Sequence, residues 1–156
     1  MPTRDVTLDE YRALARFRST LRRFLAFSAA HARDVGIEPQ QHQLLLALSG
    51  LAPAVTPTIG VLAEQLGVRH HSAVELVDRM EARGLVARVR GADDRRRVLV
   101  RFAPRGRALL RRLTLAHRAE LRSIGPALVQ ALGRVLRPRP TRRGRRGRDA
   151  RSRRTR

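Results

Sequence analysis

The spacing of hydrophobic residues predicts a chain that is helical at both ends and carries a short β-hairpin in between. Near the N-terminus, hydrophobic residues recur every three or four positions, which is the period of one face of an α-helix. These residues are Leu14, Phe17, Leu21 and Phe24. Thr7 is a predicted N-cap, and Asp9 and Glu10 follow it in the first turn, where the helix dipole favours acidic side chains. Gly36 is expected to end this helix.

Three shorter helices are predicted next, at about residues 39–48, 58–66 and 70–83. Pro39 suits the first turn of the first of them, because a proline there loses no helical hydrogen bond. Thr58 comes at the end of a proline-rich connection, LAPAVTPT, and is a predicted N-cap for the second. Gly67 breaks this second helix, and Gly84 ends the third as a C-terminal glycine.

The hydrophobic period then changes to that of a β-strand. Residues 85–90 and 97–102 are predicted strands, and residues 91–96 join them as a hairpin loop. One face of the second strand is expected to hold Val98, Val100 and Phe102.

A final helix is predicted from Pro104 onward. One side of it is apolar and holds Leu110, Leu113, Leu121 and Ile124. We expect Gly125-Pro126 to interrupt it, and a helix to resume over residues 127–136 with Leu128, Leu132 and Leu136 on one side.

The helices on either side of Gly67 fit a helix-turn-helix, and the small Ala63 suits the close crossing of such a motif. On a helical wheel, the side of the second helix expected to be buried holds Ala73, Leu76, Val77 and Met80. The opposite side, which enters the DNA major groove in this motif, holds His71, Val74, Glu75 and Asp78, with Ser72 and Arg79 flanking. A helix-turn-helix followed by a two-stranded hairpin is the order of a winged helix. The predicted fold class is therefore mainly α (α+β).

The predicted hairpin loop and the start of the next strand carry five consecutive ionisable residues, 93–97. Asp94 can hold Arg96 extended by a charge-assisted hydrogen bond, so that the guanidinium enters a narrow minor groove. Arg95 and Arg97 are predicted phosphate contacts. The alternative is a solvated turn whose charges only keep an edge hairpin soluble.

The run LAEQLGVRHHSAVELVDRMEARGLVARVRGADDRRRVLVRFAPRG resembles the winged-helix core of the multiple-antibiotic-resistance regulator (MarR) family. The matching elements are Leu66-Gly67-Val68, Leu76 to Arg79 with Glu81 and Gly84 to Val86, and Asp94-Arg95-Arg96. More loosely, the resemblance extends over residues 8–136. It implies a homodimeric bacterial transcription regulator that binds pseudo-palindromic DNA, often with an acidic aromatic or other small effector.

Two positions depart from the family pattern. Phe102-Ala103 stands where the family usually has Leu-Thr, and losing that threonine cap should cost the next helix about 1 kcal/mol. Glu75 occupies a groove-facing position where a neutral or basic residue is more usual. It can accept from a cytosine amino group or simply oppose DNA binding.

The predicted DNA-binding residues are Arg69, His70, His71, Ser72, Glu75, Arg79, Asp94, Arg95, Arg96 and Arg97. His42, with Phe17 and Leu21, is a candidate lining of an effector pocket under the first helix, although an exposed position would explain His42 equally well. His71 and Glu75 have the i, i+4 spacing of a metal-ligand pair, but DNA contact is the preferred interpretation. No metal or other cofactor is predicted. His31 and His117 carry no signal beyond their places in helices.

Composition adds a strong positive charge to this picture. The formal net charge is +21, and every basic residue is an arginine, to which genomic base composition can contribute. Residues 137–156 contain eleven arginines against Asp149 alone and are predicted to be a disordered tail. Such charge favours polyanions such as nucleic acid, or an anionic membrane surface. The tail has no apolar residues typical of a membrane-surface anchor, which argues against that alternative.

Several classes of protein are disfavoured by what the sequence lacks. Without cysteine there are no disulfides, thiolate metal sites or thiol redox sensors. The longest largely apolar stretch, 44–55, is shorter than the roughly 20 residues of a membrane-spanning helix. The polar start MPTRDVTLDE is unlike a secretory signal. We therefore expect a soluble, cytoplasmic protein, and the sequence offers no catalytic triad, carboxylate pair or phosphate loop of an enzyme.

The predicted organisation is one regulator domain over residues 7–136, with a winged-helix core at about 38–103. The flanking helices, about 7–35 and 104–136, have longer apolar stripes than this core can cover. A two-fold dimer would bury these stripes against each other and place two recognition helices about 34 Å apart, one turn of DNA. A monomer in which the stripes pack only on the core is the alternative.

The functional prediction is a sequence-specific, homodimeric and ligand-responsive transcription regulator, in the form of a repressor. The alternative is a non-specific architectural or nucleoid DNA-binding protein in which the arginine-rich tail dominates.

Overall fold

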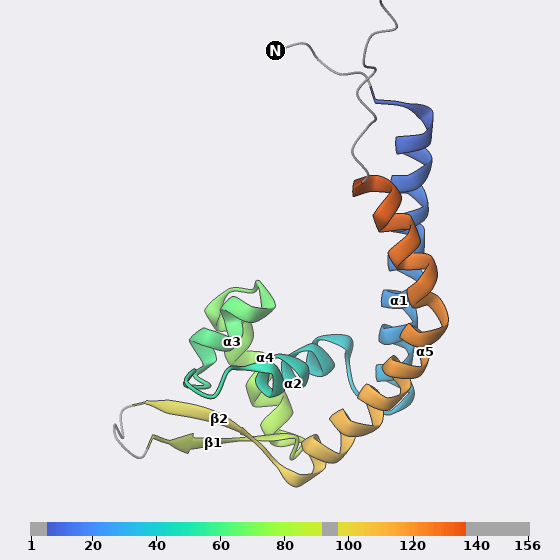
Figure 1. Cartoon of the computed structure of the whole chain (residues 1–156). Helices are drawn as coiled ribbons and strands as arrows, with labels where there is room; N and C mark the ends of the chain where they lie inside the picture. The colour runs from blue at the N-terminus through green and yellow to red at the C-terminus, as the bar shows by residue number, and fades with distance from the viewer. Residues whose placement is uncertain (1–5, 92–96, 137–156) are drawn as a thin grey trace, which may run out of the picture.

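The structure, a computed structural model, describes residues 6–91 and 97–136. Its elements are α1 (Leu8–Asp34), α2 (Pro39–Gly50), α3 (Ile59–Leu66), α4 (His70–Ala82), β1 (Val86–Arg90), β2 (Val98–Phe102) and α5 (Pro104–Leu136). In Figure 1, α1 and α5 lie side by side as a long arm, which extends from a group formed by α2, α3, α4 and the hairpin. This arrangement confirms the predicted winged-helix, mainly α fold class.

Local signals set the ends of the first helix as predicted. Thr7 and Glu10 form a capping box, in which the Glu10 backbone N–H donates to the Thr7 hydroxyl at 3.3 Å. In return, the Thr7 backbone N–H donates to the Glu10 carboxylate at 2.7 Å. After α1 the chain turns at Gly36, which has φ +82°, a left-handed conformation that glycine adopts at little cost.

The helix-turn-helix is formed by α3 and α4, as predicted. Thr58 caps α3 by accepting a hydrogen bond from the Val61 backbone N–H, and Gly67 ends α3 with φ +63°. The side of α4 predicted to be buried is at most 4% exposed at each residue: Ala73, Leu76, Val77 and Met80. Of these, Leu76, Val77 and Met80 pack into one core with Leu44, Leu45, Leu62, Leu85, Val100, Leu110 and Leu113.

The two strands pair antiparallel, from Val86 opposite Phe102 to Arg90 opposite Val98. The predicted alternation in β2 is wrong at two positions, because Val98 is 42% exposed and Leu99 only 9%. Leu99 is covered because the segment before α3 pairs with the free edge of β2, where Thr58 bridges to Leu99. Val98 pairs with Arg90 at the end of the hairpin next to its loop, beyond the cover of the core.

The predicted break at Gly125-Pro126 is also wrong, because α5 is one continuous helix with Pro126 inside it. A proline removes one backbone hydrogen bond and usually bends a helix without having to end it. Both halves of α5 pack along α1, which holds the two halves together, and Figure 1 shows α5 as a curved ribbon. On the predicted apolar side, Leu110 and Leu113 are buried and Ile124 is half-buried, but Leu121 is 40% exposed.

Candidate nucleic-acid interface

One side of α4 is open to solvent because its other side is packed into the core. Ser72 and Val74, both predicted on this side, are half-buried. The other residues predicted there or at its N-terminal end are exposed: Arg69, His70, His71, Glu75, Asp78 and Arg79. Glu75 and Arg79 lie 3.9 Å apart as an exposed ion pair on this face. The negative charge of Glu75 is therefore partly balanced by its own helix, which reduces the repulsion that it would exert on DNA.

The N-terminal end of α4 is suited to an anion. Its N-cap residue, Arg69, makes no side-chain capping hydrogen bond, and its first turn contains no acidic residue. The exposed N-terminal end of α4 therefore combines free backbone N–H groups, the positive end of the helix dipole and the side chains of His70 and His71. This end can contact a DNA phosphate while the side chains reach base edges.

Arg88, which the sequence did not single out, connects the recognition helix to the hairpin. Arg88 of β1 forms ion pairs with Asp78, at 2.6 Å, and Glu81, at 2.7 Å, both on α4. The Arg88 backbone N–H also donates to Glu81 at 2.7 Å. This backbone hydrogen bond and then the side-chain hydrogen bond from Arg88 lower the pKa of Glu81.

Asp78, assigned from the sequence to the groove-facing side of α4, thus contacts β1. The sequence signal was an arginine in a strand beside two acids spaced i, i+3 on the preceding helix. Only the packing of α4 on β1 brings these three residues together.

Replacing Arg88 with methionine is expected to lower the free energy of unfolding by about 1–3 kcal/mol, because Asp78 and Glu81 lose a charged donor. Their partial exposure keeps the loss toward the lower end of this range. Urea denaturation measures the change. Arg90→Met, on the exposed end of the same strand, is the matched control and should change stability by less than about 0.5 kcal/mol. Equal losses for both variants would contradict a stabilising role for the ion pairs of Arg88.

The wing is described only at its base. The Gly91 backbone N–H donates to the Arg97 carbonyl at 2.9 Å, which closes the hairpin loop, and the Arg97 side chain is exposed. Asp94, Arg95 and Arg96 lie outside the described residues, as does the predicted tail. Their DNA contacts and the disorder of the tail therefore stay predictions.

The alternative that His42 is simply exposed is wrong. His42 is 5% exposed and lies at the junction of α1, α2 and α5, where its ring centroid is 4.7 Å from that of His117. Burial, followed by the positive charge that His117 and His31 can carry, lowers the pKa of His42 from 6.5 to about 4. His42 is therefore neutral at pH 7.

His31 and His117 lie close to His42 in the structure, although nothing in the sequence groups the three histidines. His117 contacts the Leu113 carbonyl through Nδ1 and the Ser28 hydroxyl through Nε2, both at 2.7 Å. His31 stacks on Phe27, and both rings lie edge-on to His117. These rings pack the arm against the winged helix. In the sequence, only the spacing of aromatic residues and histidines along α1 could have indicated this cluster.

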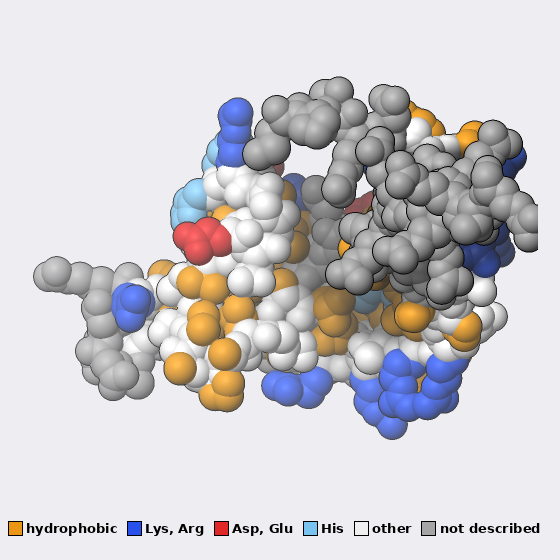
Figure 2. Space-filling model, turned by 45° about the horizontal axis from the view of Figure 1, so that its top comes forward, with side chains coloured by type: hydrophobic (Ala, Val, Ile, Leu, Met, Phe, Trp, Pro, Cys, Tyr) orange, Lys and Arg blue, Asp and Glu red, His pale blue; other side chains and the backbone are white. Residues whose placement is uncertain are grey.

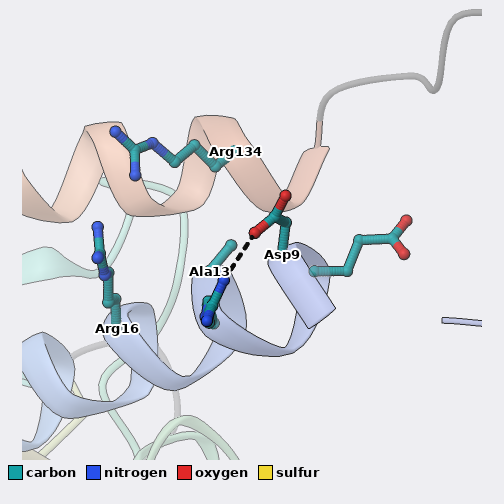
Figure 3. Close-up of a pocket in the computed structure, with 6 residues that line it drawn as sticks. Asp9, Ala13, Arg16 and Arg134 are labelled. Carbon is teal, nitrogen blue, oxygen red and sulfur yellow. Dashed lines mark hydrogen bonds and ion pairs between the residues drawn. The ribbon is translucent and has the colours of Figure 1, made fainter. Parts of the chain in front are cut away.

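Phe17 and Leu21, the other predicted effector contacts, are half-buried on α1. The structure has a groove of about 790 Å³ further along the arm, lined by Asp9, Glu10, Arg12, Ala13, Arg16 and Arg134. In Figure 3, Arg16 extends from α1 toward α5, and Asp9 pairs with Arg12 at 3.4 Å. None of the three predicted effector residues lines this groove or the smaller one of about 210 Å³ beside it.

Within residues 6–91 and 97–136, no group of three or more histidines and acidic residues is arranged to hold a metal ion. None of the helices in this part of the chain is both long and apolar enough to cross a membrane.

The winged helix is similar in sequence to known transcription regulators. The model of the MarR family matches residues 35–97. A curated relative, the uncharacterized HTH-type transcriptional regulator YcgE of Bacillus subtilis (strain 168), is 34% identical over 101 residues. The matched segment is 64% of this chain and 64% of that relative, which is less than two thirds of its length.

Solved structures share the fold over most of the chain. AbsC, a MarR family transcriptional regulator from Streptomyces coelicolor, is 21% identical with a TM-score of 0.67, over 87% of this chain and 95% of AbsC. A mutant of MepR from Staphylococcus aureus, bound to an oligodeoxyribonucleotide, is 19% identical with a TM-score of 0.60, over 78% and 84% of the two chains. Residues 35–97 therefore match the MarR family, and the fold of AbsC, a MarR family regulator, extends over most of the chain.

Proposed function

We propose that this protein is a transcription regulator that binds a pseudo-palindromic DNA operator as a homodimer. The observation that carries the proposal is the exposed face of α4. Its N-terminal end has no side-chain cap, its polar side chains are exposed, and the helix packs against strand β1 of the hairpin. Members of the MarR family are transcription regulators and not enzymes, and this class of function agrees with the geometry of α4. The oligodeoxyribonucleotide bound by MepR, on the same fold, adds support for DNA as the partner.

The arm supports a homodimer because it leaves large apolar side chains uncovered. Those at the start of α1 are Leu8, Tyr11 and Leu14, which are 62%, 60% and 46% exposed. Those near the end of α5 are Val129, Leu132 and Leu136, which are 71%, 39% and 69% exposed. Both groups lie at the end of the arm that is far from the core (Figure 1), so this core cannot cover them, whereas a second arm related by two-fold symmetry can. We infer that residues 7–35 and 104–136 dimerise.

We further propose that the regulator is a cytoplasmic repressor released by a small effector. The junction that contains His42, with Phe17 and Leu21 above it on α1, is the proposed effector site. It joins the arm, which sets the distance between two recognition helices, to the winged helix that carries each of them. A ligand that changed the packing at this junction would change that distance and thus the affinity for an operator.

Selection of DNA sites from a random pool by the full-length protein tests the regulator. The expected sites have dyad symmetry, and sedimentation should give the mass of a dimer. Glu75→Gln should select different bases at one symmetric pair of positions, because one base contact contributes about 1–3 kcal/mol of discrimination. Glu64→Gln, an exposed acid on α3, is the control and should select the wild-type site.

Selected pools without a preferred sequence would favour the alternative, a non-specific architectural DNA-binding protein. A monomer mass at micromolar concentration would contradict the two-half-site arrangement. If Glu75→Gln selects the same bases as the wild type, Glu75 does not contact bases in the groove.

A further inference from the structure

The positive charge of the chain is distributed unevenly between its parts. Helix α5 holds seven arginines and one acidic residue, Glu120, whereas residues 35–103 hold nine arginines and seven acidic residues. A genomic preference for arginine codons explains arginine in place of lysine. It does not explain why acidic residues are scarce in one helix and frequent in the neighbouring segment. The charge of α5 therefore needs a local reason.

Four of these arginines form a stripe along the first half of α5. The stripe consists of Arg107, Arg111, Arg118 and Arg122, which are separated by four, seven and four residues and are all exposed. At 100° per residue, these spacings place the four side chains within about 60° of one another around the helix. Glu120 is half-buried and points to a different side, so the stripe has no acidic neighbour on its own helix.

The guanidinium groups of the stripe are largely without protein partners. Arg107 lies over the Phe102 ring, 5.2 Å from its centroid. Across residues 6–91 and 97–136, no hydrogen bond or ion pair is made by the side chains of Arg111, Arg118 and Arg122. Like charges four residues apart destabilise a helix, so this arrangement has a cost that an anionic partner would offset.

The stripe is separate from the recognition face. Helix α4 packs on α2, α3 and β1, whereas α5 packs on α1, α2 and β2, so α2 stands between the two helices (Figure 1). In Figure 2, a group of arginine side chains gathers at the lower right, on the side of the molecule where the arm lies. Charge thus concentrates outside the part of the fold that reads bases.

We propose that the stripe on α5 binds the phosphate backbone of double-stranded DNA without reading its bases. A guanidinium matches a phosphate by paired hydrogen bonds, and four of them on one face suit a regular row of phosphates. Arg107 and Arg122 are fifteen helical steps apart, or about 22 Å, the axial length of roughly six base pairs. This inference rests on the proposed function, because it takes the partner to be the same kind of DNA.

A charge-matched pair of full-length variants tests the stripe. The test variant replaces Arg111, Arg118 and Arg122 with glutamine. The control replaces Arg18, Arg22 and Arg33, which are exposed on one face of α1, and removes the same charge from the same arm. Affinity for the selected operator and for a scrambled duplex is measured at several salt concentrations, and sedimentation gives the mass of each variant.

The test variant should flatten the slope of log affinity against log salt by up to about 2.7 per protomer, since each lost phosphate contact removes about 0.9. At low salt it should lose roughly tenfold or more in affinity, equally on both duplexes. The control should keep a slope close to that of the wild type.

Unchanged slopes for the test variant, or equal changes in both variants, would overturn the proposal. A fall of the test variant to monomer mass would also overturn it, because the stripe would then be an interface between copies. A wild-type protein that binds operator and scrambled DNA equally well would contradict the proposed regulator but not the stripe. In that case the salt dependence of binding to scrambled DNA still tests the stripe. A wild type that binds neither duplex would overturn both.

Discussion

Gly106→Ala is expected to lower the free energy of unfolding by about 3 kcal/mol, although alanine is the better helix former by about 1 kcal/mol. Gly106 is buried in the first turn of α5, against the chain that leads into β1. A Cβ there would lie 1.9 Å from the Leu85 carbonyl oxygen and 2.8 Å from its carbon. These are backbone atoms, and the same oxygen accepts a hydrogen bond from the Ala103 backbone N–H at 3.1 Å. The start of α5 must therefore move away from the core.

Urea denaturation of wild type and variant measures this loss. Gly133→Ala is the matched control, because Gly133 lies in the same helix and a Cβ there meets nothing within 4 Å. It should raise stability by about 0.5–1 kcal/mol, the ordinary gain for replacing glycine in a helix. A stabilised Gly106→Ala protein would show that α5 does not pack on Leu85 as described.

Acid is expected to destabilise the protein through His42 as the pH falls from 6.5 to 4. The pKa of His42 is about 4 in the folded protein and 6.5 as a reference, so the unfolded chain binds more protons between these values. Stability therefore rises with pH across this window and is lost as the pH falls through it. A difference of 2.5 pKa units corresponds to roughly 3 kcal/mol at pH 4.

The comparison of His42→Phe with wild type, by urea denaturation between pH 7 and pH 4, isolates this contribution. Phenylalanine keeps an aromatic ring beside His117 but cannot be protonated, so the stability difference between the two proteins should shift by roughly 3 kcal/mol in favour of the variant. Carboxylates titrate in both proteins and cancel. His71→Gln, at an exposed position on α4, should follow the wild-type curve. Parallel curves for wild type and His42→Phe would contradict a buried, neutral His42.

The ends of most helices could be predicted because their signals are local. A cap at Thr7 or Thr58 and a left-handed turn at Gly36 or Gly67 depend on a few neighbouring residues, and the structure has all of them. Pro126 shows the limit of such signals. A proline inside a helix costs a backbone hydrogen bond, which predicts a break. Packing of α5 along α1 stabilises the continuous helix, and this contact between distant segments cannot be read from the sequence of α5 alone.

The candidate DNA-binding face was accessible to the same kind of reasoning. A helical wheel separates buried from open positions on α4, so His71, Glu75 and Arg79 were placed on the solvent side correctly. The wheel could not tell which polar residues are used by the protein itself. Asp78 shares that open side, yet it pairs with Arg88, ten residues further along and on another element.

The sequence by itself determined the order and type of the elements, the buried side of α4 and the excess of positive charge, because periodicity, caps and composition are properties of neighbouring residues. Only the tertiary structure decided which distant residues meet. It placed His42 against His117, Gly106 against Leu85 and Thr58 beside Leu99. Each of these contacts depends on how whole elements pack, and packing is set by the fit of many side chains at once, which no short stretch of the chain encodes.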